Sequence, residues 1–373
     1  MTEHRFHLQV RYDIAYHTTE NAFALGNHSL MQAMGASAAG RALVYCDAGL
    51  VAADPTLPGR ICAWFAEQTA APRLAALPEV LPGGEAAKQD LGIIERVARQ
   101  VVEQHIDRHS WIIMLGGGAF LDAIGCAAAL AHRGIRQIRL PSTTLAQADA
   151  GLGVKNGLTV LGQKNLIGTF TPPWAVVNDR HFLRLQEQRS WRAGISEAFK
   201  VALIKDADFL SWLIERAPRL GERHQASLDE LVERCALLHL QHIASSGDPF
   251  EQGSSRPLDF GHWSAHRLEV CSRHGLSHGE AVAIGIAADA LYAAEQGWLQ
   301  RSLAELYVEA LRAVGFHLWH PSLELREADG TRSLYTGLAH FREHLGGELT
   351  LCMPDGPGQR QDVRELQRPV FER

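Results

Sequence analysis

The stretch SWIIMLGGGAFLD, residues 110–122, decides the fold. Its apolar first half ends in three glycines, and an Ala-rich segment continues from there to His132. A short apolar run of this kind is typical of a buried strand, and the segment after the glycines predicts a helix. Residues 135–140 form another apolar run. Strand, helix and strand in this order predict a right-handed βαβ unit and therefore a parallel sheet.

The periodicity of the apolar residues changes once along the chain, from mixed strands and helices to helices alone. Before about residue 180, further strands are expected at 42–47 and 175–179, and helices at 55–70 and 85–104. Residues 5–16 alternate like a strand or hairpin arm, and the glycine-rich text from 150 to 180 reads as a long loop. Beyond about 185, apolar residues recur at helical spacing almost to the end. An α/β half is therefore expected to precede an all-helical half, with the boundary near 180–190.

Composition narrows the class of protein. The chain has 373 residues, 46% of them hydrophobic, and a net charge of −6, which does not favour a nucleic-acid partner. The sequence shows neither a signal peptide nor an apolar stretch of membrane-spanning length. The six cysteines never pair at CxxC spacing, so reduced thiols are favoured over a disulfide framework. We expect a cytoplasmic protein with no membrane partner.

The glycine turn predicts a cofactor site. Gly116, Gly117 and Gly118 follow a buried strand and open a helix, where bare backbone and free amides suit a pyrophosphate. Leu121 departs from the GxGxxG fingerprint, so an ordinary Rossmann dehydrogenase is disfavoured. Asp122 either faces the cofactor or only favours the helix dipole. Further cofactor contacts are expected from charged residues at strand ends and at a helix start, namely Asp47, Asp179, Glu85 and Lys88.

A second constellation lies in the helical half. Glu197, His262 and His278 come from three separate segments, and one carboxylate with two imidazoles is a ligand set for a divalent metal ion. Three protein ligands with a position left open are typical of a catalytic zinc site. The alternative is that a chain with 19 histidines scatters imidazoles over helix surfaces.

These motifs, taken in order, resemble the 3-dehydroquinate synthase superfamily, the sugar phosphate cyclases. The resemblance covers roughly residues 40 to 350 and is carried by GGGAFLD (116–122), PSTTLAQAD (141–149), GQKNLIG (162–168), AGISEAFK (193–200), DFGH (259–262) and HGEAVA (278–283), together with Arg133 and Lys155. Single motifs are suggestive, whereas this set in register is specific to the superfamily but not to one member of it.

The resemblance implies a dehydroquinate synthase-like fold: a Rossmann-like NAD-binding domain over residues 1–185 and an all-α metal- and substrate-binding domain over 186–373. It implies NAD, one divalent metal ion (Zn or Co) and a homodimer. Glu197, His262 and His278 match the metal ligands, and the glycine turn, Asp122, Glu85, Lys88, Ser142 and Thr143 match the cofactor site. Expected catalytic residues are Lys200, Asp149, Lys155, His266 and Asp259. Expected substrate contacts are Arg133 (across the dimer), Lys164, Asn165, Glu251, Ser255, Arg256 and Arg342.

The reaction implied is a phosphate-eliminating cyclisation. A sugar phosphate hydroxyl is oxidised by NAD⁺, phosphate leaves, the hydride returns and an aldol addition closes a carbocycle, so no net redox change results. Cations on the phosphate and the developing enolate are expected from Arg133, Lys155, Lys164 and Lys200.

The substrate is indicated by departures from the family pattern. True 3-dehydroquinate synthases carry Arg-x-x-x-Asn before the Gly-His, where this chain has Ser255 and Asp259, and Gln241 stands where a Lys is usual. Fewer cations and one more anion disfavour a carboxylated substrate. Asp259 indicates sedoheptulose 7-phosphate, as in valiolone synthase-like members. Against this, His266 is retained and Arg256 is offset from the missing Arg by one residue.

Three alternatives stay open at this point. The first is a 3-dehydroquinate synthase acting on 3-deoxy-arabino-heptulosonate 7-phosphate with a rewired carboxylate site. The second is an NAD-dependent metal polyol dehydrogenase, which shares the fold and the glycine turn. The third is a catalytically silent binding protein, which the intact ligand set and Lys200 argue against.

Overall fold

The computed structural model describes residues 3–7, 10–35, 40–250, 256–344 and 347–372. Two compact units emerge from the packing. The first comprises residues 1–141 and 154–179, and the second comprises residues 142–153 and 180–373. The assignment of cofactor binding to residues 1–185, and of metal and substrate binding to residues 186–373, stays a prediction.

The first unit is built on a parallel sheet. Its strands are β1 (Ala15–Thr19), β2 (Arg41–Asp47), β3 (Arg73–Leu74), β4 (Glu79–Leu81), β5 (Trp111–Gly116), β6 (Arg136–Pro141) and β9 (Ala175–Asp179). They lie in the order β1-β9-β6-β5-β2-β3, β4 also pairs with β2, and every pair is parallel. β2, β5 and β9 are buried almost throughout, which explains their continuous apolar runs.

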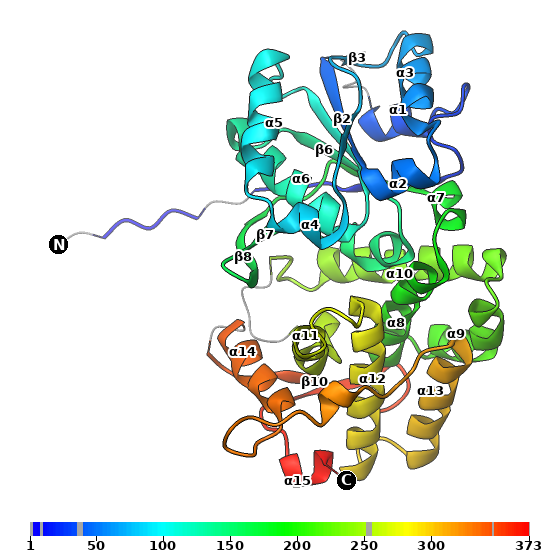
Figure 1. The fold of residues 1–373 in the computed structure, drawn as a ribbon, viewed down its shortest axis with the longest axis vertical. Helices are drawn as coiled ribbons and strands as arrows, with labels where there is room; N and C mark the ends of the chain where they lie inside the picture. Colours follow the sequence, from blue (N-terminus) through cyan, green and yellow to red (C-terminus); the bar gives the residue numbers. More distant parts are fainter. Residues whose placement is uncertain (1–2, 8–9, 36–39, 251–255, 345–346, 373) are drawn as a thin grey trace. The chain divides into compact units, whose positions relative to one another are not determined.

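Helices cover this sheet. They are α1 (Ser29–Met34), α2 (Ala48–Ala53), α3 (Leu57–Glu67), α4 (Gly84–Gln89), α5 (Gly92–Glu103) and α6 (Gly118–Leu130). Figure 1 shows α5 on one side of β2 and α1 and α3 on the other. The expected α/β class and the strand-glycine-helix unit at 110–132 are confirmed.

Two local expectations in this unit were wrong. The N-terminal strand begins only at Ala15, and residues 10–14 lie outside any helix or strand. The long loop expected at 150–180 contains an antiparallel hairpin, β7 (Lys155–Val160) and β8 (Gln163–Phe170). Its glycines suggested a loop, yet Gly168 allows close pairing, since a Cβ there would lie 2.6 Å from the Asn156 carbonyl oxygen.

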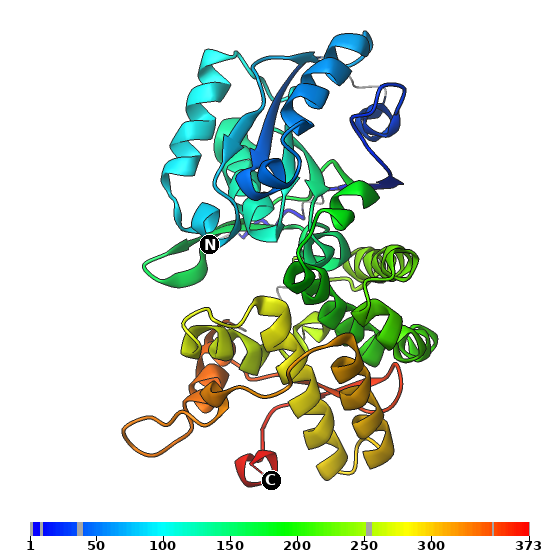
Figure 2. The ribbon, with the colours of Figure 1, turned by 45° about the vertical axis from the view of Figure 1, so that its right-hand side comes forward.

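The second unit is mainly helical. Its principal helices are α8 (Gln188–Lys205), α9 (Ala207–Gly221), α10 (Gln225–Ser245), α11 (His262–Cys271), α12 (His278–Glu295), α13 (Arg301–Val314) and α14 (Thr336–His344), with the short α7 (Arg180–Arg184) and α15 (Arg368–Phe371). Buried side chains from these helices form one continuous core, and α12 and α13 pack side by side (Figure 2). The expected helical class is confirmed.

Small deviations from that expectation have local causes. The single helix expected at 192–218 is two helices, because the Asp206 side chain accepts from the Phe209 amide and starts a new helix. A hairpin of β10 (Leu351–Pro354) and β11 (Arg360–Val363) interrupts the helical C-terminal part. None of the helices in the described ranges combines the length and apolar character needed to cross a membrane. All six cysteines are free thiols.

Candidate functional site

Close packing of α8 against residues 142–153 positions the first part of the site. Gly194 makes this possible, since a Cβ there would lie 2.4 Å from the Leu145 amide nitrogen. The segment carries Asp149 in a short π-helix (Ala146–Ala150), and α8 carries Glu197 and Lys200 one turn after the glycine. Residues far apart in sequence are therefore brought together within the second unit.

Two helix N-termini supply the imidazoles. His262 is the first residue of α11 and follows Gly261, whose φ of 76° favours glycine. A Cβ on Gly285 of α12 would lie 2.1 Å from the Gly261 carbonyl oxygen, so the two helices meet where their backbones are bare. His278 opens α12, whose first turn is fixed by a capping box between Ser277 and Glu280.

Glu197, His262 and His278 converge on one point. Nε2 of His278 lies 3.3 Å, and Nε2 of His262 3.7 Å, from Oε1 of Glu197. Glu197 is 1% exposed and His262 7%. Ligand bonds of about 2.1 Å in a tetrahedral zinc site place ligand atoms roughly 3.4 Å apart, which matches this spacing.

The remaining ring nitrogens fix both imidazoles. Nδ1 of His262 donates to the Phe260 carbonyl oxygen at 3.0 Å, and Nδ1 of His278 to Oε1 of Glu269 at 2.9 Å. Both Nε2 atoms then face the buried Oε1 of Glu197. Three acceptors at this spacing need a cation between them, so the residues fit a divalent metal ion.

Electrostatics support this interpretation. Burial opposes charge on His278, but hydrogen bonds to Glu197 and Glu269 raise its pKa to about 10. Burial likewise opposes ionisation of Glu197, yet Lys200 and the two imidazoles hold its pKa well below the ordinary value. The ligand carboxylate is therefore ionised, and an ion that binds here replaces the proton on His278.

A second set of possible ligands overlaps the first. His266, Glu269 and His278 also bring ligand atoms within 4.8 Å of one another. In this set, however, the Glu269 carboxylate already accepts from His278 Nδ1. Glu197, His262 and His278 therefore fit a metal ion better than the second set, and Glu269 orients His278.

Lys200 lies between two carboxylates. Its Nζ is 2.7 Å from Oδ2 of Asp149 and 2.6 Å from Oε2 of Glu197, and its side chain is 3% exposed. Burial opposes the ammonium charge, but Asp149 and then Glu197 raise the pKa of Lys200 above its usual value. Lys200 is therefore a permanent cation and not a proton acceptor. It lies beside Glu197, His262 and His278, which we call the metal cluster because they could together hold one metal ion.

Other predicted residues surround this cluster. The His266 ring lies 5.3 Å from the His262 ring and stacks on His278 at 5.9 Å. Asp259 ends a 3-10 turn just before α11, close enough for its charge to act on the pKa of His262. Arg256, half-buried, precedes that turn. The predicted substrate contacts Glu251 and Ser255 lie outside the described residues.

The glycine turn of the first unit has the bare backbone that a pyrophosphate requires. A Cβ on Gly116 would lie 2.6 Å from the Phe120 ring and 3.0 Å from Asp47 Cβ. Gly117, at the N-cap of α6, offers no side chain to the first amides of that helix. Free amides at a helix N-terminus, approached over glycine, suit a dinucleotide phosphate, so these residues fit NAD.

Charged residues gather beside this turn. Lys88 of α4 pairs with Asp122 of α6 at 2.5 Å, and Lys164 of β8 lies 4.0 Å from Glu85 of α4. Four predicted site residues are thus brought together in the first unit. Their assignment to the cofactor or the substrate stays a prediction.

Several predicted cofactor residues also have structural contacts. The Asp47 carboxylate accepts from the Gly49 amide and caps α2. The Asp179 carboxylate accepts from the backbone amides of Asn21 and Ala22 at 2.8 Å each and is 1% exposed. Thr143 Oγ1 accepts from the Ala146 amide.

Four further predicted residues are exposed: Arg133, Lys155 and Asn165 in the first unit, and Arg342 in the second. Arg133 is exposed with a φ of 62° in the turn after α6, and Asn165 is exposed on β8 with a φ of 57°. Lys155 is exposed at the start of β7. Arg342 donates to the Gly347 carbonyl oxygen at 2.6 Å.

Sequence reasoning missed two acidic residues near the cluster. Glu269 follows His262 by seven residues, a spacing that places both on one helix face, and this was an available signal. Asp289 is a fully buried acid in the apolar helix α12; it accepts from Trp263 Nε1 at 3.0 Å. A buried carboxylate within an otherwise apolar helix was the signal there.

Comparisons with known proteins complete the description. Residues 79–193 match the family of 3-dehydroquinate synthase N-terminal domains, and residues 194–332 match the corresponding C-terminal family. A 3-dehydroquinate synthase from Solibacter usitatus is 34% identical over 305 residues, which cover 80% of this chain and 83% of that protein. A 2-epi-5-epi-valiolone synthase from Streptomyces glaucescens is 32% identical, covering 74% of this chain and 70% of that protein.

The solved structures that this chain resembles include enzymes of the same kind. A 2-epi-5-epi-valiolone synthase from Streptomyces hygroscopicus subsp. jinggangensis, with NAD⁺ and Zn²⁺ bound, superposes with a TM-score of 0.85 and 25% identity. The match covers 99% of this chain and 97% of that one. A 2-deoxy-scyllo-inosose synthase complexed with carbaglucose-6-phosphate, NAD⁺ and Co²⁺ has a TM-score of 0.77 at 20% identity, covering 96% and 95%, and supports the fold alone.

Proposed function

The chain belongs to the 3-dehydroquinate synthase family, and from this premise we propose that it is an NAD- and metal-dependent sugar phosphate cyclase. The proposed substrate is a neutral heptulose phosphate, sedoheptulose 7-phosphate, and the product a carbocyclic cyclitol formed with loss of phosphate. The observation that carries this proposal is the convergence of Glu197, His262 and His278 beside the buried Lys200.

The proposed reaction needs two groups that the chain does not itself provide, a metal ion and NAD. When bound, the metal ion supplies Lewis acidity at a substrate hydroxyl, and NAD supplies a reversible hydride acceptor. Glu197, His262 and His278 would hold the metal. The amides and bare backbone at Gly116–Gly118 would hold the pyrophosphate of NAD.

The chain's own residues then set the electrostatics. Lys200, kept protonated by Asp149 and Glu197, provides a fixed positive charge for the enolate oxygen that develops when the C–H next to the new ketone is deprotonated, before the electron pair leaves with phosphate. Glu269 and the Phe260 carbonyl hold the two imidazoles in one tautomer, so no reorientation is needed during the reaction. His266, stacked on His278 and outside the ligand set, is proposed as a catalytic residue that contacts the substrate.

The substrate assignment depends on the segment before α11. Asp259 stands where 3-dehydroquinate synthases have Asn, and Ser255 where they have the carboxylate-binding Arg. A carboxylate near the site disfavours a second carboxylate on the substrate. The resemblance to the valiolone synthase structure supports the same branch. We further propose a cytoplasmic homodimer in which Arg133 of one copy reaches the phosphate in the other.

The second candidate is a 3-dehydroquinate synthase acting on 3-deoxy-arabino-heptulosonate 7-phosphate. It is favoured by the relatives of that name, among them the 34% identical one from Solibacter usitatus. Arg256, next to the Ser255 position, would have to supply the missing contact to the substrate carboxylate.

A single assay distinguishes these functions. The Zn²⁺- or Co²⁺-loaded protein is incubated with each sugar phosphate and catalytic NAD⁺, while inorganic phosphate and NADH are followed. A cyclase releases phosphate without accumulating NADH, and the proposal predicts this with sedoheptulose 7-phosphate. Phosphate release only from the heptulosonate selects the second candidate. NADH accumulation with a polyol and no phosphate release would indicate a dehydrogenase instead.

A further inference from the structure

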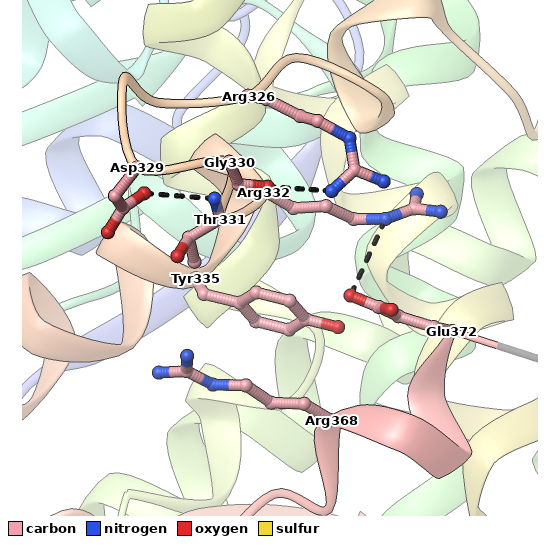
Figure 3. A pocket seen from close by; sticks show the side chains of 8 residues that line it. All are labelled: Arg326, Asp329, Gly330, Thr331, Arg332, Tyr335, Arg368 and Glu372. Carbon is pink, nitrogen blue, oxygen red and sulfur yellow. Dashed lines mark hydrogen bonds and ion pairs between the residues drawn. The ribbon is translucent and has the colours of Figure 1, made fainter.

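A pocket in the C-terminal part of the second unit concentrates positive charge. It has a volume of about 360 Å³ and is lined by Arg326, Asp329, Gly330, Thr331, Arg332, Tyr335, Arg368 and Glu372 (Figure 3). None of these residues belongs to the metal cluster. Three guanidinium groups face two carboxylates, so the lining carries one excess positive charge.

The carboxylates neutralise the arginines only in part. Glu372 lies 3.6 Å from Nε of Arg332, which is beyond hydrogen-bonding distance. The Asp329 carboxylate accepts from the Thr331 amide at 2.9 Å. Arg326 donates to the Gly330 carbonyl oxygen and Arg332 to the Leu323 carbonyl oxygen, and Arg368 lies over the Tyr335 ring, 4.8 Å from its centre. Most of the guanidinium N–H donors are therefore left for a ligand.

Buried polar atoms give an independent indication of a ligand. Tyr335 is only 4% exposed, and its hydroxyl has no well-aligned hydrogen bond in the part of the chain that the structure describes, although the Glu372 carboxylate is near enough to act on its pKa. Nε of Arg332 is likewise buried without a hydrogen bond there. Figure 3 shows the Tyr335 ring between the side chains of Arg332 and Arg368, with its hydroxyl beside the Glu372 carboxylate. Glu372 satisfies these two buried donors only in part, and an anion with several acceptor atoms would complete their hydrogen bonds.

We propose that this pocket binds the phosphate group of a small metabolite, at a site separate from the metal cluster. A phosphate presents acceptor oxygens in several directions, which suits guanidinium groups that approach from different segments. A planar carboxylate has only two oxygens and satisfies fewer of these donors. This inference does not depend on the proposed cyclase activity.

Arginine modification tests the position of the site directly. The full chain is labelled with phenylglyoxal at constant ionic strength, with and without inorganic phosphate, and each arginine-containing peptide is quantified by mass spectrometry. We expect phosphate to protect Arg326 and Arg368 while leaving Arg312, an exposed arginine of α13 paired with Glu309, labelled as before. Equal labelling of Arg368 with and without phosphate overturns the proposal. So does equal protection by succinate, because it would mean that the pocket does not select phosphate.

Variants test the contribution of individual charges. Calorimetric titration with inorganic phosphate should show a binding event that Arg332→Gln/Arg368→Gln weakens by roughly tenfold or more. Glu372→Gln should strengthen the same event severalfold, since it removes the competing carboxylate. Arg312→Gln is the matched control and should change nothing. If Glu372→Gln, a surface change that leaves the core intact, does not strengthen binding, the proposal is wrong even where the arginine variants fold poorly.

Discussion

Nδ1 of His278 lies 2.9 Å from Oε1 of Glu269, a residue that is 4% exposed on α11. The contact fixes the ring of His278 so that Nε2 faces Glu197. Carboxylates that orient a ligand histidine in this way raise its basicity and restrict its motion. Glu269 therefore belongs to the proposed metal centre, where it orients a ligand and does not bind the ion itself.

Changing Glu269 to Gln should weaken metal binding. The amide can still accept from His278 but carries no charge, so we expect Zn²⁺ affinity to fall by about 10- to 100-fold. Competition with a chelator of known affinity measures this. Glu309→Gln, on the exposed face of α13, is the control. Unchanged affinity in Glu269→Gln would mean that the contact only packs the two helices.

Replacing Lys200 by Met should destabilise the fold as well as abolish activity. The change leaves the carboxylates of Asp149 and Glu197 buried without their shared cation, which costs about 3–5 kcal/mol. Urea unfolding of the metal-free protein measures the loss. Adding Asp149→Asn should recover part of it, because one of the two charges is removed. Additive losses in the double variant would contradict the electrostatic interpretation.

Asp289 predicts a pH dependence of stability. Burial raises the pKa of Asp289 from its ordinary 3.8 to about 7, although hydrogen bonds from Trp263 and the Gly261 amide oppose the shift. Between these values the folded chain binds more protons than the unfolded chain, so stability falls as pH rises through the interval.

The test for Asp289 is its Asn variant. From pH 5 to pH 8, the free energy of unfolding of the wild type should fall by on the order of 2 kcal/mol relative to Asp289→Asn. Denaturant melts at both pH values give this difference. Parallel pH profiles of the two proteins would show that Asp289 is already ionised in the fold.

Substrate choice should respond to the segment before α11. Asp259→Asn combined with Ser255→Arg restores the pattern of 3-dehydroquinate synthases and adds a cation for a substrate carboxylate. We expect the ratio of kcat/KM for the heptulosonate to that for sedoheptulose 7-phosphate to rise by roughly tenfold or more. Steady-state phosphate release measures the ratio. If the ratio does not move, Asp259 does not determine specificity.

The sequence predicted those parts of the fold that depend on local pattern. The runs at 42–47 and 111–116 identified buried strands because parallel strands covered on both faces are continuously apolar. Gly116–Gly118 identified a turn, and at Gly116 a Cβ would clash with the Phe120 ring. The hairpin of β7 and β8 was not predicted, because its glycine-rich sequence has the composition of a loop and gives no sign of the strand pairing.

The candidate site also has a part that the sequence predicted and a part that it did not. Chemical type and motif placed Glu197, His262 and His278 together, and the structure brings them together. The ion pair between Asp149 and Lys200 joins residues that are 51 positions apart in the sequence, so no local periodicity predicts it. Glu269 was accessible from its spacing to His262, but the partner of its carboxylate, His278, lies on another helix.

The central claim is that one divalent ion held by Glu197, His262 and His278 is required for phosphate release. The most direct test is the metal content and activity of Glu197→Gln, which keeps the side-chain volume and removes the charged ligand. After equilibration with Zn²⁺ and gel filtration, the wild type should retain about one ion per chain, and the variant close to none. The variant should still bind NAD⁺, and its phosphate release should be lost. A variant that keeps a full equivalent of zinc and wild-type turnover would contradict the account.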